Sequence, residues 1–506
     1  MFMTITSFRF LLLVGVGLVI YYLLPRSWQW VELLLLSLVF YHYAARTHTI
    51  IYLIISTFTA YICTIWMDRL KKSRKCRKGA VTALTAAALT VNLLLWFVFK
   101  GQDFWRAVIN PDIELVAALG MGYYTLQVLG YILDCAWETV EPQKNPFKLF
   151  LFVCFFPQLT TGPISQYSQL ESLYQKHKFQ YVNVAHGAQR ILWGFFKKLV
   201  LAERVGILLS GITASPDAYH GYYAWIVLLM YPIQMYADFS GGMDIVIGVA
   251  EMFDIHLAEN FRNPFFSRTS QEFWQRWHIT LGAWAKGYVL YPMLKSKWMV
   301  KFSKFTRKKF GKEIGKFLAT SVGMFALWMV MGIWHGAVKY IIGVSLWYWI
   351  ILMLGELFAP FFKNVTEKFR FRTESFSWHL FQSARTYLIY AVGAAFFSMG
   401  IEKGYLLLKQ ALEAVTGAAS NPWIFFDGSI LNSGITWGDI NLMIIAVFLL
   451  FVVGVLREKY GYARIWMDKQ SFVFRWFSWI ALFLLVLIYG KYGPGYSAAE
   501  FIYQGF

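Results

Sequence analysis

The stretch FLATSVGMFALWMVMGIWHGAVKYIIGVSLWYWIILML, residues Phe317–Leu354, is apolar over its whole length. Apart from His335 and Lys339, it contains no side chain that ordinarily carries a charge. A helix that crosses a bilayer needs about 20 mostly apolar residues, so this stretch has room for more than one crossing. It therefore predicts membrane-spanning helices, with a histidine inside the apolar part of the protein.

Similar apolar windows recur from one end of the chain to the other. They lie at Phe10–Pro25, Leu33–Ala45, Thr47–Met67, Gly79–Phe99, Leu115–Leu133, Leu149–Leu170, Ala218–Ala237, Phe317–Val338, Tyr340–Gly355, Thr386–Ile401, Ile440–Leu456 and Trp476–Gly490, with Ile191–Ile207 and Phe273–Leu294 as further candidates. Several are short, so some helices are expected to be tilted, buried by neighbours or re-entrant. We expect an all-α polytopic membrane protein with roughly 11 to 13 membrane segments. The first window is interpreted as a retained helix, because no cleavage site follows it.

The charge of the chain agrees with this class. Of the 506 residues, 58% are apolar and only 15% are charged, whereas soluble domains carry about a quarter charged residues. The net charge of +19 lies largely in short basic blocks between apolar windows, such as Arg69–Lys78, Lys295–Lys316 and Lys363–Arg372. Such blocks are typical of cytoplasmic loops. We therefore expect a lipid bilayer around the chain and no nucleic-acid partner, with the N-terminus outside. Recruitment of an acidic partner or anionic lipid is the alternative interpretation.

His335 is the first candidate for chemistry, because ionisable groups inside a membrane protein are costly and are functional candidates by default. It lies between Gly332 and Gly336, whose small size leaves room for a neighbouring helix or a substrate. A neutral imidazole in a dry site can accept a proton from a hydroxyl group. The alternative is a histidine that is hydrogen-bonded to the carbonyl of a neighbouring helix.

His278 is the second candidate, in the segment QEFWQRWHITL. Thr269 followed by Glu272 matches a capping box, so a helix is predicted to begin there. Trp274, His278 and Leu281 would share one face of this helix, with Trp277 beside them. A histidine among tryptophans indicates a pocket lining, although a structural histidine packed by tryptophan is an equally simple interpretation.

Charged residues near these histidines are further candidates. Asp238 and Asp244 lie in YADFSGGMD and could orient a histidine or bond to backbone groups. Arg276 could contact an anionic donor or pair with a carboxylate. The sequence contains no P-loop, HExxH or GxSxG motif, and no CxxC pair among its four cysteines. We therefore expect neither a metal site nor a tightly bound cofactor.

Three segments of the chain are similar to motifs of a known family. They are EFWQRWHITLGAWAKGYVLYP, GIWHGA around His335, and FFPQLTTGPISQY at Phe155–Tyr167. On these residues the chain resembles the membrane-bound O-acyltransferase superfamily, in its bacterial alginate O-acetylase branch. The resemblance runs from about Leu149 to Phe506. It implies a ring of tilted helices around a central funnel, with variable N-terminal helices at 1–148, a catalytic core at 149–400, and an outer loop, last helices and tail at 401–506.

The resemblance also implies a reaction and its residues. His335 would match the family's catalytic histidine and His278 the second histidine, with Trp274, Trp277, Trp334, Asp238, Asp244 and Arg276 around the substrate. An acyl group, expected to be acetyl, would pass from a cytoplasmic acyl-CoA or acyl carrier protein thioester to a hydroxyl of an extracellular polysaccharide or cell-wall glycan. A membrane-anchored or extracellular SGNH-like acyltransferase would be the partner, and the bacterial inner (plasma) membrane the location.

The C-terminal tail adds an expectation that rests on the resemblance alone. It reads Phe501-Ile502-Tyr503-Gln504-Gly505-Phe506, and relatives suggest that the tail tyrosine carries the acyl group. Tyr503 is therefore a catalytic candidate, although Gln504 and Gly505 depart from the family pattern. The alternative is a tail that anchors the chain at the membrane interface.

Under this hypothesis His335 removes the proton of the acceptor hydroxyl, and His278 positions the donor or stabilises the oxyanion by donating a hydrogen bond. Two other classes of function stay open. A proton-coupled transporter or polysaccharide export component would use the same buried residues as a proton relay, although no inverted repeat is visible. A scaffold for a partner enzyme would keep its function without either histidine.

Overall fold

The computed structural model of the chain describes residues 3–73, 78–109, 112, 115–214, 219, 221–336, 338–417, 423 and 427–492. Within these residues the regular secondary structure is helical, and the pairing of Phe261 with Trp277 is an isolated antiparallel bridge. The prediction of an all-α protein is confirmed. Tyr503 lies outside the described residues, so its role stays a prediction.

The first half of the chain forms helices α1 to α10. They are α1 (Phe8–Leu23), α2 (Gln29–Ala44), α3 (Ile50–Lys72), α4 (Lys78–Lys100), α5 (Gln102–Val108), α6 (Met121–Ala136), α7 (Pro146–Cys154), α8 (Tyr181–Phe195), α9 (Glu203–Ala214) and α10 (Tyr222–Met252). A π-helical turn at Phe196–Ala202 joins α8 to α9.

The second half begins with short helices and continues with long ones. They are α11 (Ser270–Arg276), α12 (Ile279–Ala285), α13 (Tyr291–Lys295), α14 (Lys297–Phe310), α15 (Lys312–His335), α16 (Val338–Tyr340), α17 (Trp347–Lys368), α18 (Phe376–Thr416), α19 (Trp437–Tyr460), α20 (Ala463–Asp468) and α21 (Phe472–Tyr489). Two more π-helical turns, at Lys286–Leu290 and Ile341–Leu346, connect α12 to α13 and α16 to α17.

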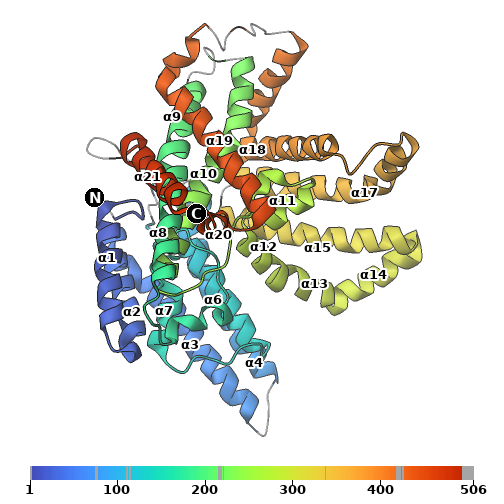
Figure 1. Cartoon of the computed structure of the whole chain (residues 1–506). Helices are drawn as coiled ribbons and strands as arrows, with labels where there is room; N and C mark the ends of the chain where they lie inside the picture. Colours follow the sequence, from blue (N-terminus) through green and yellow to red (C-terminus); the bar gives the residue numbers. More distant parts are fainter. Residues whose placement is uncertain are drawn as a thin grey trace.

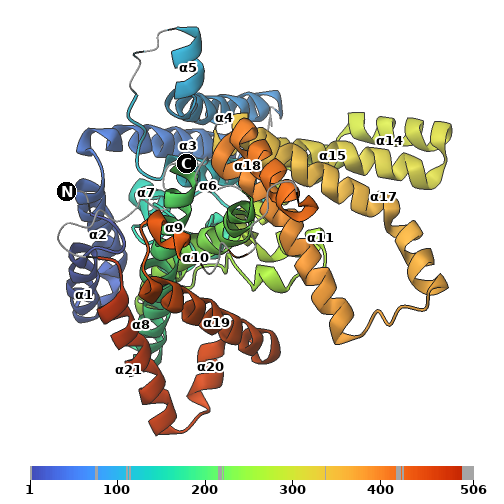
Figure 2. The ribbon, with the colours of Figure 1, turned by 90° about the horizontal axis from the view of Figure 1, so that it is seen from above.

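The helices are arranged around α10. Figure 1 shows α1 and α2 on one side of the molecule and α14, α15 and α17 on the other, with α10 between them, and Figure 2 shows the same order from above. Among the described residues, 7 helical segments are long and apolar enough to cross a membrane. They are Thr47–Lys72, Lys78–Lys100, Lys312–His335, Ile341–Lys368, Phe376–Thr416, Trp437–Tyr460 and Phe472–Tyr489. The chain is therefore a multi-pass membrane protein.

Two predicted segments are not continuous helices. The window Leu149–Leu170 is α-helical only as far as Cys154, after which the chain turns and ends in a 3-10 helix that begins at Tyr167. Pro157 and Pro163 explain this, because proline has no N–H for a helical hydrogen bond and clashes with the preceding turn. The window Phe273–Leu294 is broken at His278, where the backbone enters the left-handed region.

A third window is longer than predicted, because α10 continues beyond Ala237 to Met252. Two glycines of this helix, Gly241 and Gly248, face α8. A Cβ on Gly248 would lie 2.6 Å from the carbonyl oxygen of Gly187, and a Cβ on Gly241 would lie 3.0 Å from that of Gly194. Gly187 and Gly194 in α8 are seven residues apart, and so are Gly241 and Gly248 in α10. Seven residues make about two helical turns, so the four glycines form one line of close backbone contact between the helices, which we call the seam.

This seam leads to a first prediction. Gly248→Ala should lower the free energy of unfolding by about 1–3 kcal/mol, because the added methyl group meets backbone atoms that cannot rotate away. The matched control is Gly355→Ala in α17, where a Cβ meets nothing within 4 Å. Equilibrium unfolding of the purified variants in an SDS titration measures the difference. Equal stability of the two variants would show that the seam is loosely packed.

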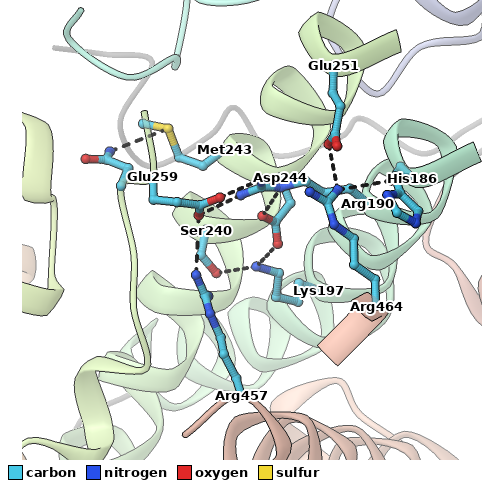
Figure 3. Close-up of polar contacts among 11 residues, drawn as sticks. His186, Arg190, Lys197, Ser240, Met243, Asp244, Glu251, Glu259, Arg457 and Arg464 are labelled. Carbon is cyan, nitrogen blue, oxygen red and sulfur yellow. Dashed lines mark hydrogen bonds and ion pairs between the residues drawn. The ribbon is translucent and has the colours of Figure 1, made fainter. Parts of the chain in front are cut away.

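A buried ion-pair network lies beside the seam, and we call it the Arg190 network. The Arg190 guanidinium contacts Asp244 at 2.9 Å and both carboxylate oxygens of Glu259 at 2.7 and 2.8 Å. Lys197 contacts Asp244 at 2.7 Å, and Arg457 contacts Glu259 at 3.3 Å (Figure 3). Four segments are thereby joined: α8 with the turn that follows it, α10, the loop after α10, and α19.

The positive charges of this network keep the carboxylate of Glu259 ionised. Burial raises the pKa of Glu259, but the nearby guanidinium groups of Arg190 and Arg457 outweigh that effect, and the pKa lies below its usual value. An ionised Glu259 holds the loop between α10 and α11 against the helices. The next residue along this loop is Asn260, which contacts one of the two candidate histidines.

Candidate active site

The structure brings the two candidate histidines to one cavity. Its lining contains His278 and His335, two of the predicted tryptophans, and residues from α10, α12, α15, the turn before α17, α17 and α18. The full lining is Met235, Trp274, Trp277, His278, Leu281, Met331, His335, Gly343, Val344, Tyr348, Tyr390, Gly393, Ala394 and Phe397. The two histidines are 57 positions apart in the sequence (335 − 278), so only the fold makes them neighbours.

The cavity is narrow, with a volume of about 20 Å³. A space of this size accommodates about one water molecule. Binding of a larger group therefore requires movement of the wall. Met235 and Met331 belong to that wall, and the unbranched side chain of methionine adapts its shape easily.

His335 is the last residue of α15 and is 8% exposed. The helix ends there because Gly336 has a φ of 102°, a conformation that favours glycine. Its ring contacts Trp334 at 4.8 Å, Phe397 at 5.4 Å and Tyr340 at 5.5 Å between centroids. The imidazole is thus held among aromatic rings at the end of a membrane-spanning helix.

Gly332 has the role expected from its size, because it lets another element approach α15. A Cβ on Gly332 would overlap the hydroxyl of Ser345, and that hydroxyl donates a hydrogen bond to the carbonyl of Trp328 at 2.7 Å. The close contact brings the π-helical turn Ile341–Leu346 against α15. Two residues of this turn, Gly343 and Val344, form part of the cavity wall.

His278 is not on a continuous helix, which corrects the prediction from the sequence. The predicted start is found, since the Thr269 side chain accepts a hydrogen bond from the backbone of Glu272, but α11 ends at Arg276. His278 has φ 45° and ψ 52°, and α12 begins after it. A non-glycine residue in this region is strained by about 1–3 kcal/mol, so the surroundings must hold it.

Backbone pairing and one side chain hold His278 in place. The segment before α11 pairs with the break, since Arg262 N–H donates to the Arg276 carbonyl at 2.9 Å and Ile279 N–H donates to the Asn260 carbonyl at 3.0 Å. The side-chain oxygen of Asn260 lies 3.2 Å from Nδ1 of His278. The ring is 3% exposed and meets Phe239 edge to face at 4.9 Å.

The predicted tryptophans surround the two histidines. Trp274 and Trp277 both line the cavity, although Trp274 is in α11 and Trp277 follows the last residue of that helix. Trp334 is buried next to the cavity, with its ring 6.0 Å from that of His278, and its indole N–H donates to the Gly122 carbonyl at 2.9 Å. The geometry therefore agrees with the interpretation of His278 and its tryptophans as the lining of a pocket.

The predicted charged residues lie elsewhere. Asp244 belongs to the Arg190 network, and Asp238 pairs with Lys198. Arg276 pairs with Glu272 and Glu458 at 2.7 and 2.6 Å. None of the three is among the residues that line the cavity. Their contacts join helices, so these ion pairs hold the frame around the cavity.

Several residues that line the cavity could not be identified from the sequence alone. Tyr348 and Tyr390 come from α17 and α18, and the Tyr348 hydroxyl donates to the Tyr390 carbonyl at 3.1 Å. Tyrosine is abundant in this chain, with 30 examples, so neither stood out. Asn260, which contacts His278 but does not line the cavity, was also missed. Its position in the segment LAENFRNPFF, as a polar residue just before several aromatic residues, was a sign that the sequence did contain.

The arrangement can perform proton transfer in a dry space. Two imidazoles face a shared cavity whose other lining side chains are apolar or aromatic. An imidazole can take a proton from a hydroxyl or donate one to a developing oxyanion. Among the described residues, no group of three or more His, Cys, Asp or Glu side chains could hold a metal ion.

Comparison with curated proteins finds bacterial enzymes. The chain is 29% identical to a probable alginate O-acetylase of Pseudomonas syringae, over 57% of this chain and 53% of the relative. It is 27% identical to a teichoic acid D-alanyltransferase of Bacillus subtilis, over 71% and 89% respectively. It is 28% identical to a peptidoglycan O-acetyltransferase of Helicobacter pylori, over 56% of each chain.

The match with two of these three relatives spans about half of the relative's length. No family model matches the sequence. The names of the three relatives describe transfer of an acetyl or a D-alanyl group to alginate, teichoic acid or peptidoglycan.

Proposed function

We propose that this protein, a homologue of bacterial alginate O-acetylases, teichoic acid D-alanyltransferases and peptidoglycan O-acetyltransferases of the membrane-bound O-acyltransferase superfamily, is a multi-pass membrane O-acyltransferase. One observation carries the proposal. His278 and His335, from segments far apart in the sequence, line one buried cavity with aromatic walls. Such a cavity suits a reaction in which a proton must move while water is excluded.

The reaction that fits is acyl transfer from a thioester to a hydroxyl. One imidazole takes the proton of the hydroxyl as its oxygen attacks the thioester carbonyl, and the other imidazole contacts the reacting groups. The carbon–sulfur bond then breaks, and the leaving thiolate takes up the proton that the protonated imidazole gives back. The narrow cavity has room for about one water molecule, so it keeps bulk water away from the thioester, but its wall must open to admit the acyl group.

The names of the relatives and the membrane setting support a choice of substrates. We propose an acyl-CoA or an acyl carrier protein thioester as the donor, loaded from the cytoplasmic side, and acetyl as the acyl group. The acceptor is a hydroxyl of an extracellular polysaccharide or cell-wall glycan, as the names of the relatives suggest. A membrane-anchored or extracellular SGNH-like acyltransferase partner completes the transfer, and the bacterial inner membrane is the location.

Tyr503 is proposed as an acyl carrier between the two sides of the membrane. An acyl-tyrosine would divide the overall transfer into two exchanges, each with a hydroxyl nucleophile. Incubation of the purified protein with acetyl-CoA, followed by mass spectrometry, should find an acetyl group on the peptide that contains Tyr503. An unmodified peptide in a preparation that still acetylates polymer would exclude the relay.

Label transfer in membrane vesicles tests the proposed function itself. Inverted vesicles from bacterial cells that produce the protein receive acetyl-CoA or an acetylated acyl carrier protein, each labelled with ¹⁴C in the acetyl group. We expect label in cell-surface polymer that mild base releases as acetate, and none in vesicles from cells without the gene. If neither donor labels polymer, and proteoliposomes without any acyl donor show proton-coupled flux, the protein is a transporter.

A further inference from the structure

Helix α14 (Lys297–Phe310) has six basic side chains and no acidic one. Its 14 residues extend about 21 Å. The hydrocarbon core of a bilayer is about 30 Å thick, so α14 is too short to cross it, and it is not among the 7 candidate spans. Figure 1 and Figure 2 both show α14 at the outer edge of the molecule, next to α15. It is therefore a surface helix that leads into a membrane-spanning one.

One side of α14 packs against α15. Met299 and Thr306 on this side are buried. The Thr306 hydroxyl donates to the Gly315 carbonyl at 2.9 Å, and a Cβ on Gly315 would lie 2.4 Å from backbone atoms of Arg307. The two helices therefore approach closely, and α15 covers this side of α14. The other sides of α14 are mostly exposed.

Four lysines follow the side of α14 that faces away from α15, and we call them the lysine ridge. They are Lys297, Lys301, Lys304 and Lys308, all exposed, and their spacing of four, three and four residues places them on one helix face. Among the described residues, no ion pair is recorded for any of them. Four like charges along about 17 Å repel one another. A surface that carries negative charge would relieve this repulsion.

Aromatic side chains lie along one flank of the ridge, and we call Trp298, Phe302 and Phe305 the aromatic strip. The rings of Trp298 and Phe302 stack with centroids 5.7 Å apart. Trp298 and Phe305 are 57% and 59% exposed. Nζ of Lys309 lies 5.9 Å from the centre of the Phe305 ring. Aromatic rings beside lysines are typical of a helix that lies between the headgroups and the acyl chains of a bilayer.

We propose that α14 binds anionic phospholipid of the cytoplasmic leaflet, with the phosphate groups on the lysine ridge and the acyl chains against the aromatic strip. The basic block that contains α14 is expected on the cytoplasmic side, where anionic lipids give the membrane a negative surface potential that attracts lysine. The proposal goes beyond a role of these charges in topology. It does not depend on the proposed acyl transfer, because no acyl donor or acceptor takes part.

The exposed surface of α15 favours lipid over an acidic protein as the occupant. Ile314, Phe325 and Ile333 are exposed along this helix, as a helix in lipid requires. Ile314 is only four residues beyond Phe310, which ends α14. The apolar surface of the span therefore begins where α14 ends, so the edge of the bilayer reaches α14. An acidic protein would match the lysine ridge, whereas a phospholipid matches the ridge and the aromatic strip together.

Native mass spectrometry of the purified full-length chain tests the proposal by counting bound lipid during titration with phosphatidylglycerol or phosphatidylcholine. We expect tighter binding of phosphatidylglycerol. Replacement of all four ridge lysines by glutamine should weaken phosphatidylglycerol binding by about tenfold or more, because each lysine contributes to attraction of the anionic headgroup. Binding of phosphatidylcholine should change little. Unchanged binding of phosphatidylglycerol in this variant would overturn the proposal.

Two further variants keep the test decisive. Lys301→Gln with Lys304→Gln removes only the middle of the ridge, and should weaken phosphatidylglycerol binding by about threefold or more even if the fourfold variant does not fold. Trp298→Ser with Phe305→Ser should weaken the binding of both lipids, because it removes the contact with the acyl chains. Thermal unfolding shows that each variant is folded. If the aromatic variant binds both lipids normally, the acyl chains do not lie on the strip and the proposed binding mode is wrong.

The basic block at the end of α17 supplies the matched control. Its four exposed cations, Lys363, Lys368, Arg370 and Arg372, alternate with the acidic residues Glu367 and Glu374. Their replacement by glutamine removes the same charge as the ridge variant and should leave the affinity for phosphatidylglycerol nearly unchanged. An equal loss in both variants would mean that net charge alone attracts the lipid, and would refute a site on α14.

An acidic protein is the remaining occupant that the same variants can detect. Purified acyl carrier protein is the probe, added to the full-length chain in place of lipid. We expect the ridge variant to lose affinity for phosphatidylglycerol. If it instead binds this lipid normally and loses affinity for acyl carrier protein, the lysine ridge is a docking surface for an acidic protein and the lipid proposal is wrong.

Discussion

His335→Ala should nearly abolish acyl transfer while leaving the protein folded. A group that transfers or stabilises a proton in the transition state contributes roughly 10²–10⁴-fold to the rate, and the rate should fall by that factor. The fold should survive, because His335 is at the end of α15, where Gly336 already terminates the helix. Loss of the ring enlarges the cavity. Label in base-released acetate, measured in inverted vesicles, gives the rate.

The control for this variant is a histidine away from the cavity. His379 lies on α18 near the protein surface and contacts Arg268 at 3.1 Å. His379→Ala should keep the rate of the unaltered protein. Size-exclusion elution and thermal unfolding of both variants show whether they are folded. A folded His335→Ala protein with normal transfer would refute the assignment, and would favour a scaffold that holds a partner enzyme.

Arg190→Met should have the largest effect on stability. Arg190 binds Asp244 and Glu259 together, and its side chain is 11% exposed. Removal of one partner from a buried ion pair typically costs about 3–5 kcal/mol, because the remaining charges stay buried without compensation. Two carboxylates would be affected here. Lys197 and Arg457 keep contact with them, so the protein is expected to fold, with a lower free energy of unfolding in an SDS titration.

Lys363→Met is the matched control for this change, since it removes a basic side chain from an ion pair at the surface. Lys363 and Glu367 are 75% and 65% exposed and lie 3.8 Å apart. An exposed pair of this kind contributes about 0–1 kcal/mol. If Arg190→Met costs no more than Lys363→Met, the buried network does not hold α8, α10 and α19 together.

The membrane-spanning helices could be predicted, because a long apolar stretch of sequence indicates that lipid, and not water, surrounds the helix. The stretch Phe317–Leu354 contains most of α15 and the beginning of α17, as its lack of charge indicated. His335 and His278 were both recognisable, the first as a titratable group in an apolar window and the second as a histidine among tryptophans. Their placement in one cavity agrees with these interpretations.

What the sequence could not supply was the effect of tertiary contacts on local conformation. Helical periodicity placed Trp274 and His278 on one continuous face, but pairing with the segment at Asn260 breaks that helix. Asp238 and Asp244 were expected around the substrate on the resemblance to the acyltransferase superfamily, but both carboxylates form ion pairs outside the cavity lining. Their partners, Lys198 and Arg190, lie about 40 to 54 positions away, so the ion pairs become visible only when α8 and α10 are side by side.

The cavity is proposed to be the place where a thioester and a hydroxyl meet, and the most direct measurement is the position of the donor. The ketone analogue of acetyl-pantetheine is suitable, because pantetheine is common to CoA and acyl carrier proteins and the ketone cannot transfer its acyl group. A cryo-EM structure of the protein with this analogue should place its carbonyl between the His278 and His335 rings, with Met235 and Met331 displaced. An analogue bound elsewhere, with both rings still enclosed by an unchanged wall, would contradict the account.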